Sequence, residues 1–279
     1  MEGKGRVCVT GGTGFLGSWI IKTLLEHGYF VNTTVRSDPE CKRDLSFLTN
    51  LPGASQKLQI FRADLRNPDS FCAAIEGCIG VFHVASPMNF QEEPEEVLTK
   101  INIDGAISIL RACLNSSTVK RVVYTSSAAA VSLNGKDDDV MDESFWSDVD
   151  FLRASKTYGW SYAISKTLTE KAVLEFGELN GLDVVTLLPT YVVGPFLCPK
   201  LPMSVGVSLA LLFGNKDYYR FLFRMNLVHV EDVARAHIYL LEHPIPKGRY
   251  ICSTGPTHIE EMHQLLSVKY PEYQIPTLE

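Results

Sequence analysis

The chain has 279 residues, a length that allows one large domain or two domains that share a core. It carries 26 Lys and Arg against 32 Asp and Glu, a net charge of −6, and 46% of its residues are hydrophobic. This composition excludes a disordered or collagen-like chain. Because no block of clustered Lys and Arg offers a footprint for phosphate backbones, we do not expect nucleic acid as a partner.

The cysteines and the apolar segments bear on the location of the protein. Seven cysteines occur without a Cys-x-x-Cys pair or zinc-like His spacing, so we expect reduced thiols and no metal site. The chain passes from Met1 into an apolar run at Val7, which leaves no room for a signal peptide. The longest apolar stretch, 205–213, is too short to span a bilayer. These features predict a cytoplasmic protein without a membrane span.

Short apolar runs alternate with segments of helical period along the first two thirds of the chain. Strands are expected at 7–10, 31–35, 58–61, 80–85, 122–126 and 184–188. Helices are expected before Gly28, at 94–115 and at 158–179. This alternation predicts an α/β fold with a Rossmann-type, doubly wound parallel sheet.

The pattern changes after Pro189, where Gly and Pro residues interrupt the periodicity. We therefore expect a sheet domain at residues 1–189 and a smaller C-terminal lobe at residues 190–279. The elements expected in the lobe are a helix at 231–242, a strand at 248–252 and a helix at 259–270.

A glycine-rich turn joins the first strand to the first helix. It consists of Thr10, Gly11, Gly12, Thr13, Gly14, Phe15, Leu16 and Gly17. In such a turn Gly11 permits the sharp bend, Gly14 lets the backbone approach a pyrophosphate, and Gly17 lets the helix pack closely on the sheet. Free amides at the helix N-terminus then face the anion. The strand before it and the amphipathic helix after it favour a dinucleotide site over a chance glycine cluster.

The end of the second strand bears on which dinucleotide binds. Arg36 stands there, followed by Lys42 and Arg43, and a guanidinium suits the 2′-phosphate of NADP(H). The alternatives are that Arg36 is an ordinary surface charge and that Asp38 serves an NAD ribose. Further contacts to the adenine edge are expected from Asp64 and Leu65, although an Asp is also common in turns.

Tyr162 and Lys166 lie four residues apart in the helix expected at 158–179. This spacing places both side chains on one face. A phenol is a poor acid near neutral pH, but an adjacent ammonium stabilises its phenolate. Tyr162 can then give a proton to a carbonyl oxygen as hydride reaches the carbon. The pair alone is weak evidence, but together with the glycine turn it favours a reductase.

The turn at 10–17, the pair Ser126-Ser127 and the pair Tyr162/Lys166 together resemble the extended short-chain dehydrogenase/reductase superfamily over the whole chain. More narrowly, several segments resemble the plant dihydroflavonol-reductase-like group: 32–36, 80–87, 124–127, 142–147 and 165–168. Three more are similar to isoflavonoid-reducing members of that group: 51–54, 173–177 and 230–237.

The resemblance implies a catalytic triad of Ser127, Tyr162 and Lys166, with Ser126 the less suitable hydroxyl. It also implies that residues 1–189 bind NADPH and that the lobe at 190–279 binds substrate. In addition to the glycine turn and the basic residues, the cofactor contacts implied are Val84, Ala85, Ser86, Thr125, Tyr162, Lys166, Pro189 and Val192. The implied substrate contacts are Ser86, Ser132, Thr190 and Phe221.

Two departures from the group affect the expected substrate. Ser132 stands where dihydroflavonol reductases carry an Asn that reads ring hydroxyls, and Tyr162 lacks the Tyr-Cys-Tyr context of cinnamoyl-CoA reductases. Members of the group also continue past residue 279, so the substrate lobe is expected to be incomplete. Phe221 and its aromatic neighbours favour a planar aromatic substrate, although such a stripe also suits a plain core.

The sequence therefore predicts an NADPH-dependent reductase of a small aromatic or phenolic ketone of the isoflavonoid type. Three alternatives stay open: an NAD(P)-dependent dehydrogenase of a specialised alcohol, a dihydroflavonol 4-reductase, and a non-enzymatic NADP(H) sensor. An intact triad argues against the sensor. The direction and the cofactor that give turnover separate the reductase from the dehydrogenase. The sequence does not determine the oligomeric state.

Overall fold

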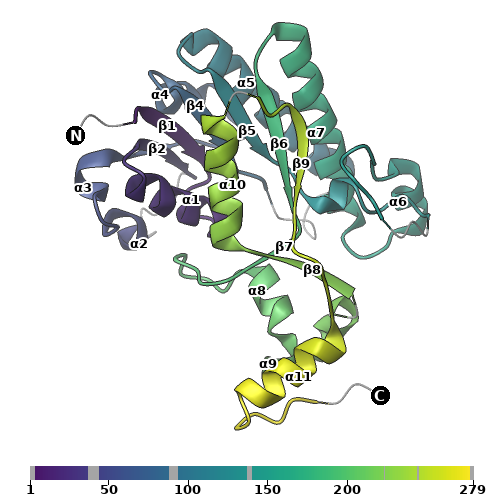
Figure 1. Ribbon diagram of the computed structural model, residues 1–279. Coiled ribbons are helices and arrows are strands. Elements are labelled where there is room, and N and C mark those ends of the chain that lie inside the picture. The colour runs from purple at the N-terminus through teal and green to yellow at the C-terminus, as the bar shows by residue number, and fades with distance from the viewer. Residues whose placement is uncertain are drawn as a thin grey trace.

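A large parallel sheet with helices on both faces forms the upper part of the molecule (Figure 1). The computed structural model describes residues 4–36, 44–87, 94–136, 140–222, 224–243 and 245–276. Its strands are β1 (Arg6–Thr10), β2 (Phe30–Val35), β3 (Leu58–Arg62), β4 (Gly80–His83), β5 (Arg121–Thr125), β6 (Val184–Pro189) and β9 (Gly248–Cys252). They lie in the order β3-β2-β1-β4-β5-β6-β9, and every neighbouring pair is parallel. The predicted Rossmann-type fold is confirmed.

Two helical layers cover this sheet because its strands are apolar on both faces. The main helices are α1 (Phe15–Glu26), α5 (Glu95–Ser116), α7 (Trp160–Asn180) and α10 (Val230–Glu242). Val7 and Val9 of β1 face the core that α1 and α10 share, whereas Cys8 between them faces the core under α5 and α7. The alternation of side chains along a strand thus feeds two separate cores.

The strand β9 is part of the large sheet and the helix α10 packs on it, although the sequence places both in the C-terminal lobe. The apolar side of α10, with Val233 and Ile238, packs in the α1 core, and β9 pairs with β6 from Val185 onwards. The chain leaves the large sheet through Thr190 between β6 and β7, and it returns with α10, which follows β8 directly. The division expected at residue 189 therefore differs from the arrangement of these elements.

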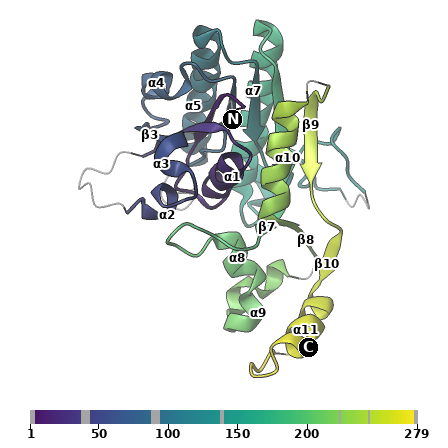
Figure 2. The same ribbon diagram turned by 60° about the vertical axis from the view of Figure 1, so that its left-hand side comes forward.

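The small lobe lies below the carboxyl ends of the strands, as Figure 2 shows. Its sheet has the order β10-β8-β7. The elements are β7 (Tyr191–Val193), α8 (Met203–Ser208), α9 (Ala210–Phe213), η3 (Lys216–Phe221), β8 (Arg224–His229), β10 (Pro256–His258) and α11 (Ile259–Lys269). Leu211, Leu222, Met225 and Ile259 form its apolar core. Only Thr190 separates β6 from β7, so the lobe is joined directly to the edge where parallel sheets bind ligands.

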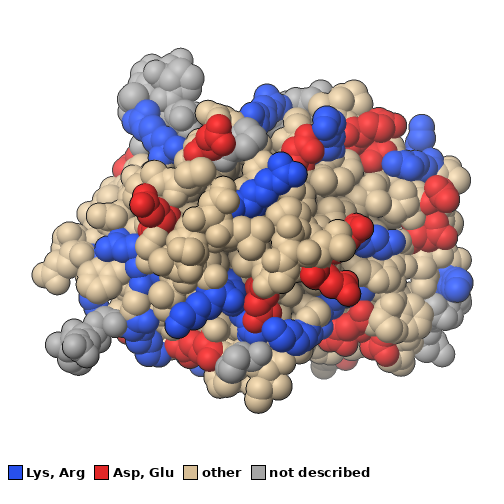
Figure 3. Space-filling view, turned by 90° about the horizontal axis from the view of Figure 1, so that it is seen from above, with Lys and Arg blue, Asp and Glu red and all other residues tan. Residues whose placement is uncertain are grey.

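Shorter elements complete the described chain. They are α2 (Ser46–Thr49), α3 (Ala54–Lys57), η1 (Pro68–Phe71), α4 (Cys72–Ile75), η2 (Ala128–Ala130) and α6 (Val149–Ser155). On the face opposite the small lobe, basic and acidic side chains are intermixed (Figure 3). Across the described residues, no helix combines the length and the apolar character that crossing a membrane requires.

Candidate active site

The glycine turn is pressed so closely against its surroundings that Gly12 and Gly17 leave no room for a side chain. Gly11 has φ +75°, which L-residues with side chains rarely adopt. A Cβ on Gly12 would overlap Thr33 Oγ1, and one on Gly17 would overlap the carbonyl oxygen of Gly11. A Cβ on Gly14 would have only that oxygen within 4 Å, at 3.4 Å. Space is therefore left at the N-terminus of α1, and the turn fits a pyrophosphate.

Thr10, which ends β1, ties the turn to the end of β4. Its Oγ1 accepts hydrogen bonds from the backbone N–H groups of Val84 and Ala85, both at 3.0 Å. With two donors already on this oxygen, the Thr10 hydroxyl donates to His83 Nδ1, 3.0 Å away. Burial lowers the pKa of His83 to about 3, so its ring is neutral and can accept. Thr10 thus holds two other predicted cofactor residues, Val84 and Ala85, beside the turn.

The residues predicted at the adenine end of the cofactor differ in burial and in hydrogen bonding. Arg36 follows β2 directly and is exposed. Asp64 forms a tight turn, because its Oδ1 accepts the N–H of Arg66 at 2.9 Å, and Leu65 is buried under α5. The Asp64 side chain therefore serves the turn that the sequence allowed as an alternative. Lys42 and Arg43 lie outside the described residues.

Tyr162, Lys166 and Ser127 converge where β5 ends beside α7. The Tyr162 hydroxyl is hydrogen-bonded to the Ser127 side chain. Lys166 is buried, its Nζ donates to the carbonyl oxygen of Thr125 at 3.1 Å, and it lies 5.9 Å from the centre of the Tyr162 ring. Residues from three predicted roles thus meet at the carboxyl edge of the sheet.

The pKa values at this point are set mainly by burial. Burial lowers the pKa of Lys166 to about 8, against the opposing effect of the Glu170 carboxylate. Burial raises the pKa of Tyr162, and the hydrogen bond with Ser127 only partly offsets this. The sequence predicts that Lys166 makes Tyr162 more acidic, whereas in the structure the cost of burying the phenolate dominates and the pKa of Tyr162 is raised. Both groups are therefore protonated near neutral pH.

His83 connects the two halves of the site across β4. Its ring lies 5.3 Å from the ring of Tyr124, and the charge of Lys166 contributes to its lowered pKa. The glycine turn and the Tyr162 side chain therefore border the same stretch of the sheet edge, with β4 between β1 and β5.

The predicted substrate residues occupy different surroundings. Ser86 donates to Asn102 Oδ1 on α5 at 3.1 Å, Ser132 is exposed after η2, and Thr190 links β6 to the strand end at Cys252. Pro189 ends β6, and Val192 lies in β7 at the root of the small lobe.

Phe221 of the small lobe packs beside the N-terminal end of α7. Its ring lies 4.7 Å from the ring of Tyr158, which precedes α7, and Arg220 covers both rings at 5.0 Å. Tyr191 of β7 also contributes to the raised pKa of the Tyr162 phenol. The sequence missed Tyr158, which lies four residues before Tyr162, whereas the resemblance places Tyr191 in the segment 189–192 beside the nicotinamide.

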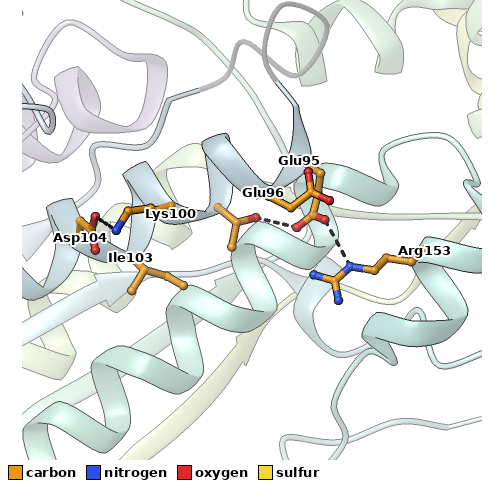
Figure 4. Close-up of a pocket in the computed structure, with 7 residues that line it drawn as sticks. Glu95, Glu96, Lys100, Ile103, Asp104 and Arg153 are labelled. Atoms are coloured by element: carbon orange, nitrogen blue, oxygen red, sulfur yellow. Dashed lines mark hydrogen bonds and ion pairs between the residues drawn. The ribbon is translucent and has the colours of Figure 1, made fainter.

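A concavity between α5 and α6 is lined by other residues (Figure 4). There the buried Glu95 accepts from Thr99 Oγ1 at 3.0 Å and from Arg153 Nε at 3.3 Å. None of the residues lining it is a predicted site residue. Among the described residues, no three His, Cys, Asp or Glu side chains gather as a metal would require.

A parallel sheet of this order, a glycine turn after its first strand, and a Tyr162/Lys166 pair beside β5 together define an NAD(P)-dependent oxidoreductase of the short-chain dehydrogenase/reductase class. The chain belongs to the NAD dependent epimerase/dehydratase family, which it matches over residues 7–252. The resemblance drawn from the sequence is confirmed.

Three relatives indicate the place of the chain in this family. It is 67% identical to vestitone reductase of Medicago sativa over 279 residues, which is 100% of this chain and 85% of the relative. The crystal structure of the alfalfa enzyme superimposes with a TM-score of 0.90 at 65% identity, over 98% of this chain and 84% of that one.

The other two relatives are more distant. A bifunctional dihydroflavonol 4-reductase/flavanone 4-reductase of Malus domestica is 46% identical over 97% of this chain and 78% of its own. The structure of Gre2 from Candida albicans in complex with NADPH has a TM-score of 0.81 at 27% identity, over 96% of this chain and 83% of that one.

Proposed function

We propose that the chain is an NADPH-dependent reductase of a ketone on an isoflavonoid-type phenolic substrate, with Ser127, Tyr162 and Lys166 as its catalytic residues. The observation that carries the proposal is the convergence of these three side chains at the carboxyl end of β5, beside the glycine turn. The relationship to vestitone reductase supports the substrate class. The predicted cytoplasmic location stays a prediction, which cell fractionation would test.

The bound cofactor supplies the hydride in this scheme. Ser127 holds the substrate oxygen through its hydroxyl, next to the Tyr162 hydroxyl to which it is already hydrogen-bonded. Tyr162 gives its proton to that oxygen, and its raised pKa keeps the proton available at neutral pH. Lys166, with a pKa of about 8, is protonated there and stabilises the phenolate that remains. The protonated state of both groups favours reduction over oxidation.

The glycine turn and Arg36 are the groups proposed to hold NADPH. The amides at the N-terminus of α1 suit the pyrophosphate, where Gly14 leaves room. Arg36, exposed at the end of β2, suits the 2′-phosphate. The complex of Gre2 with NADPH supports this choice. Val84 and Ala85 beside Thr10, together with Ser86, Thr125, Pro189 and Val192, are proposed to line the nicotinamide end.

The substrate is proposed to bind between the sheet edge and the small lobe. Phe221 and Tyr158 bring aromatic rings to the N-terminal end of α7, two turns or less from Tyr162. Aromatic rings there suit a planar phenolic substrate. Thr190 and Ser132 are the proposed polar contacts.

The test is the consumption of NADPH with isoflavanones, dihydroflavonols and aryl ketones, followed by absorbance. Tyr162→Phe should lower kcat by about 100-fold or more, because it removes the proton donor. Tyr239→Phe is the matched control, since Tyr239 is an exposed tyrosine of α10 outside the site. If no ketone is reduced while NADPH binds, the sensor alternative gains; turnover only of alcohols with NADP would favour the dehydrogenase.

A second measurement tests the cofactor. Arg36→Ala should weaken NADPH binding by about 10-fold or more and leave NADH binding nearly unchanged, because only NADPH carries the 2′-phosphate. Fluorescence titration with both cofactors measures this. Equal effects on the two would show that Arg36 does not contact the phosphate.

A further inference from the structure

A buried carboxylate that the proposed mechanism does not use lies directly behind the catalytic residues. Glu170 is on α7, four residues after Lys166 and eight after Tyr162, so the three share one side of the helix. Its exposed fraction is 0%. A buried charge is costly unless it is paired and hydrogen-bonded, so its partners indicate what it does.

Four hydrogen bonds satisfy this carboxylate. Ser126 Oγ donates to Oε2 at 2.6 Å, and Thr186 Oγ1 donates to Oε1 at 2.7 Å. Arg249 donates from Nε to Oε1 at 2.8 Å and from its terminal nitrogen to Oε2 at 3.4 Å. The partners come from the end of β5, from β6 and from β9, which are neighbouring strands. One carboxylate thus joins α7 to three adjacent strands.

Ser126 is the partner that reaches the catalytic groups. It lies between Thr125, whose carbonyl oxygen accepts the hydrogen bond from Lys166, and Ser127, whose side chain is bonded to Tyr162. A shift of Ser126 therefore moves the partners of both catalytic side chains. The hydrogen bond to Glu170 is charge-assisted, which makes it one of the stronger restraints available in the site.

Arg249 holds the carboxylate from the other side and is itself fixed. It donates to the carbonyl oxygens of Glu143 and Phe145, at 2.8 Å and 2.5 Å, and lies 3.5 Å from the centre of the Trp146 ring. Its side chain is 7% exposed in its ion pair with Glu170. The segment 142–147 and β9 therefore support Glu170 from outside α7.

The charge of Glu170 also acts on Lys166. Ionisable groups from several elements surround the ammonium or its carboxylate neighbour: Tyr162 and Glu170 of α7, Tyr124 of β5, His83 of β4 and Arg249 of β9. His83 is neutral, and the tyrosine pKa values are raised, so Glu170 is the negative charge that favours a protonated Lys166.

We propose that Glu170 is a positioning residue for the reduction, which aligns Lys166 and Tyr162 through Ser126 and is held in place by Arg249. The proposal rests on the proposed function of the site. It assigns Glu170 no contact with substrate or cofactor.

The first test is Glu170→Gln, which keeps the shape of the side chain and removes the charge. We expect kcat to fall between about 10-fold and about 100-fold, with KM for NADPH within about twofold. The alkaline limb of the pH–rate profile should move to lower pH by about one unit, because Lys166 loses the charge that favours its protonated form. Glu178→Gln, an exposed change on the same helix, is the control. A wild-type kcat and pH profile in E170Q would overturn the proposal.

Two more variants separate alignment from charge and guard against misfolding. Ser126→Ala breaks the link to the strand end but keeps the ion pair, so kcat should fall while the alkaline limb stays in place. The double variant E170Q/R249M removes both charges, which proteins often tolerate better than one unpaired charge. It should fold and retain the shifted limb of E170Q. A double variant with the wild-type limb would contradict the proposal.

A readout independent of turnover completes the test. The pKa of Lys166 can be followed by NMR of ¹³Cε-labelled lysine, with Lys166→Arg to assign the signal. It should be lower in E170Q than in the wild type, and equal values would overturn the proposal. If the wild type reduces no ketone, the proposed function fails, whereas this comparison still decides the role of Glu170.

Discussion

The two halves of the candidate site are built in opposite ways. The glycine turn uses eight consecutive residues, 10–17, and is shaped by the absence of side chains. The Tyr162 corner, which we define as residues 125–127 with Tyr162 and Lys166, draws on β5 and α7 and is held by buried polar groups. The glycine turn is formed by residues adjacent in the chain and is shaped by close packing. The Tyr162 corner joins residues far apart in the chain and is held by hydrogen bonds and charge.

This difference indicates how each half should fail. At Gly17 backbone is pressed against backbone and cannot yield, so the glycine turn should lose its shape when one methyl group is added there. The Tyr162 corner should instead respond to the loss of a charge or a hydrogen bond, because both interactions are stronger in a buried site than in water.

The largest effect is expected from Gly17→Ala. The new Cβ would overlap the carbonyl oxygen of Gly11, so we expect the free energy of unfolding to fall by about 3 kcal/mol, together with loss of NADPH binding. Gly14→Ala is the matched variant, since its Cβ has only one neighbour, at 3.4 Å. It should keep its thermal midpoint and lose cofactor affinity. Equal stability of the two variants would show that close packing does not shape the turn.

Next come two buried Thr→Val changes, one beside each half. Thr186→Val removes a hydrogen bond to the Glu170 carboxylate and should cost about 1.5 to 3 kcal/mol. Thr33→Val removes a hydrogen bond of 2.8 Å to the neutral carbonyl of Val9 beside the glycine turn, and should cost about 0.5 to 1.5 kcal/mol. Urea unfolding measures both. A larger loss of unfolding free energy for Thr33→Val than for Thr186→Val would show that charge does not distinguish the two halves.

The pH dependence of stability involves one buried histidine beside each half. Burial lowers the pKa of His83, bonded to Thr10, to about 3, and that of His237, bonded to Thr125, to about 4. An unfolded histidine titrates near about 6.5, so below that pH the unfolded chain takes up protons that the folded chain does not. Stability is therefore complete above about pH 6.5 and falls as the pH drops towards about 4 for His237 and 3 for His83.

Each histidine should contribute about 1.4 kcal/mol to the loss of stability between about pH 7.5 and about pH 5.5. His237→Gln should therefore flatten the dependence by that amount in urea unfolding. His243→Gln, at an exposed position, should leave the slope unchanged. A slope unaffected by His237→Gln would mean that this ring is not neutral in the folded protein.

The smallest effect is expected outside both halves. Arg153→Ala removes the ion pair with Glu95 in the concavity of Figure 4. Arg153 is 46% exposed, so water screens the ion pair, and Glu95 keeps its hydrogen bond from Thr99; the loss of unfolding free energy should therefore stay below about 1 kcal/mol, with kcat unchanged. A clear drop in kcat would extend the functional site to the interface of α5 and α6.

Much of the large sheet could be predicted because its strands and helices carry their own periodicity. The six strands expected from apolar runs all occur in the large sheet, and the helix expected at 158–179 is α7, Trp160–Asn180. The return of α10 and β9 to that sheet could not be predicted. Their pairing with α1 and β6 joins segments far apart in the chain, and no local pattern specifies such partners.

The candidate site divides in the same manner. The glycine turn and the spacing of Tyr162 and Lys166 are visible as short motifs. Glu170 was missed, although its spacing of four from Lys166 could have singled it out. Its importance depends on Ser126, Thr186 and Arg249, which only the fold brings together.

The class of fold, the dinucleotide turn and the pair of groups proposed to move the proton could be predicted from the sequence, because each depends on residues a few positions apart. The protonation of that pair depends instead on the folded chain. Burial raises the pKa of Tyr162 and lowers that of Lys166, and the charge of Glu170 opposes the second shift. Desolvation depends on everything packed around a group, and that packing exists only in the folded chain.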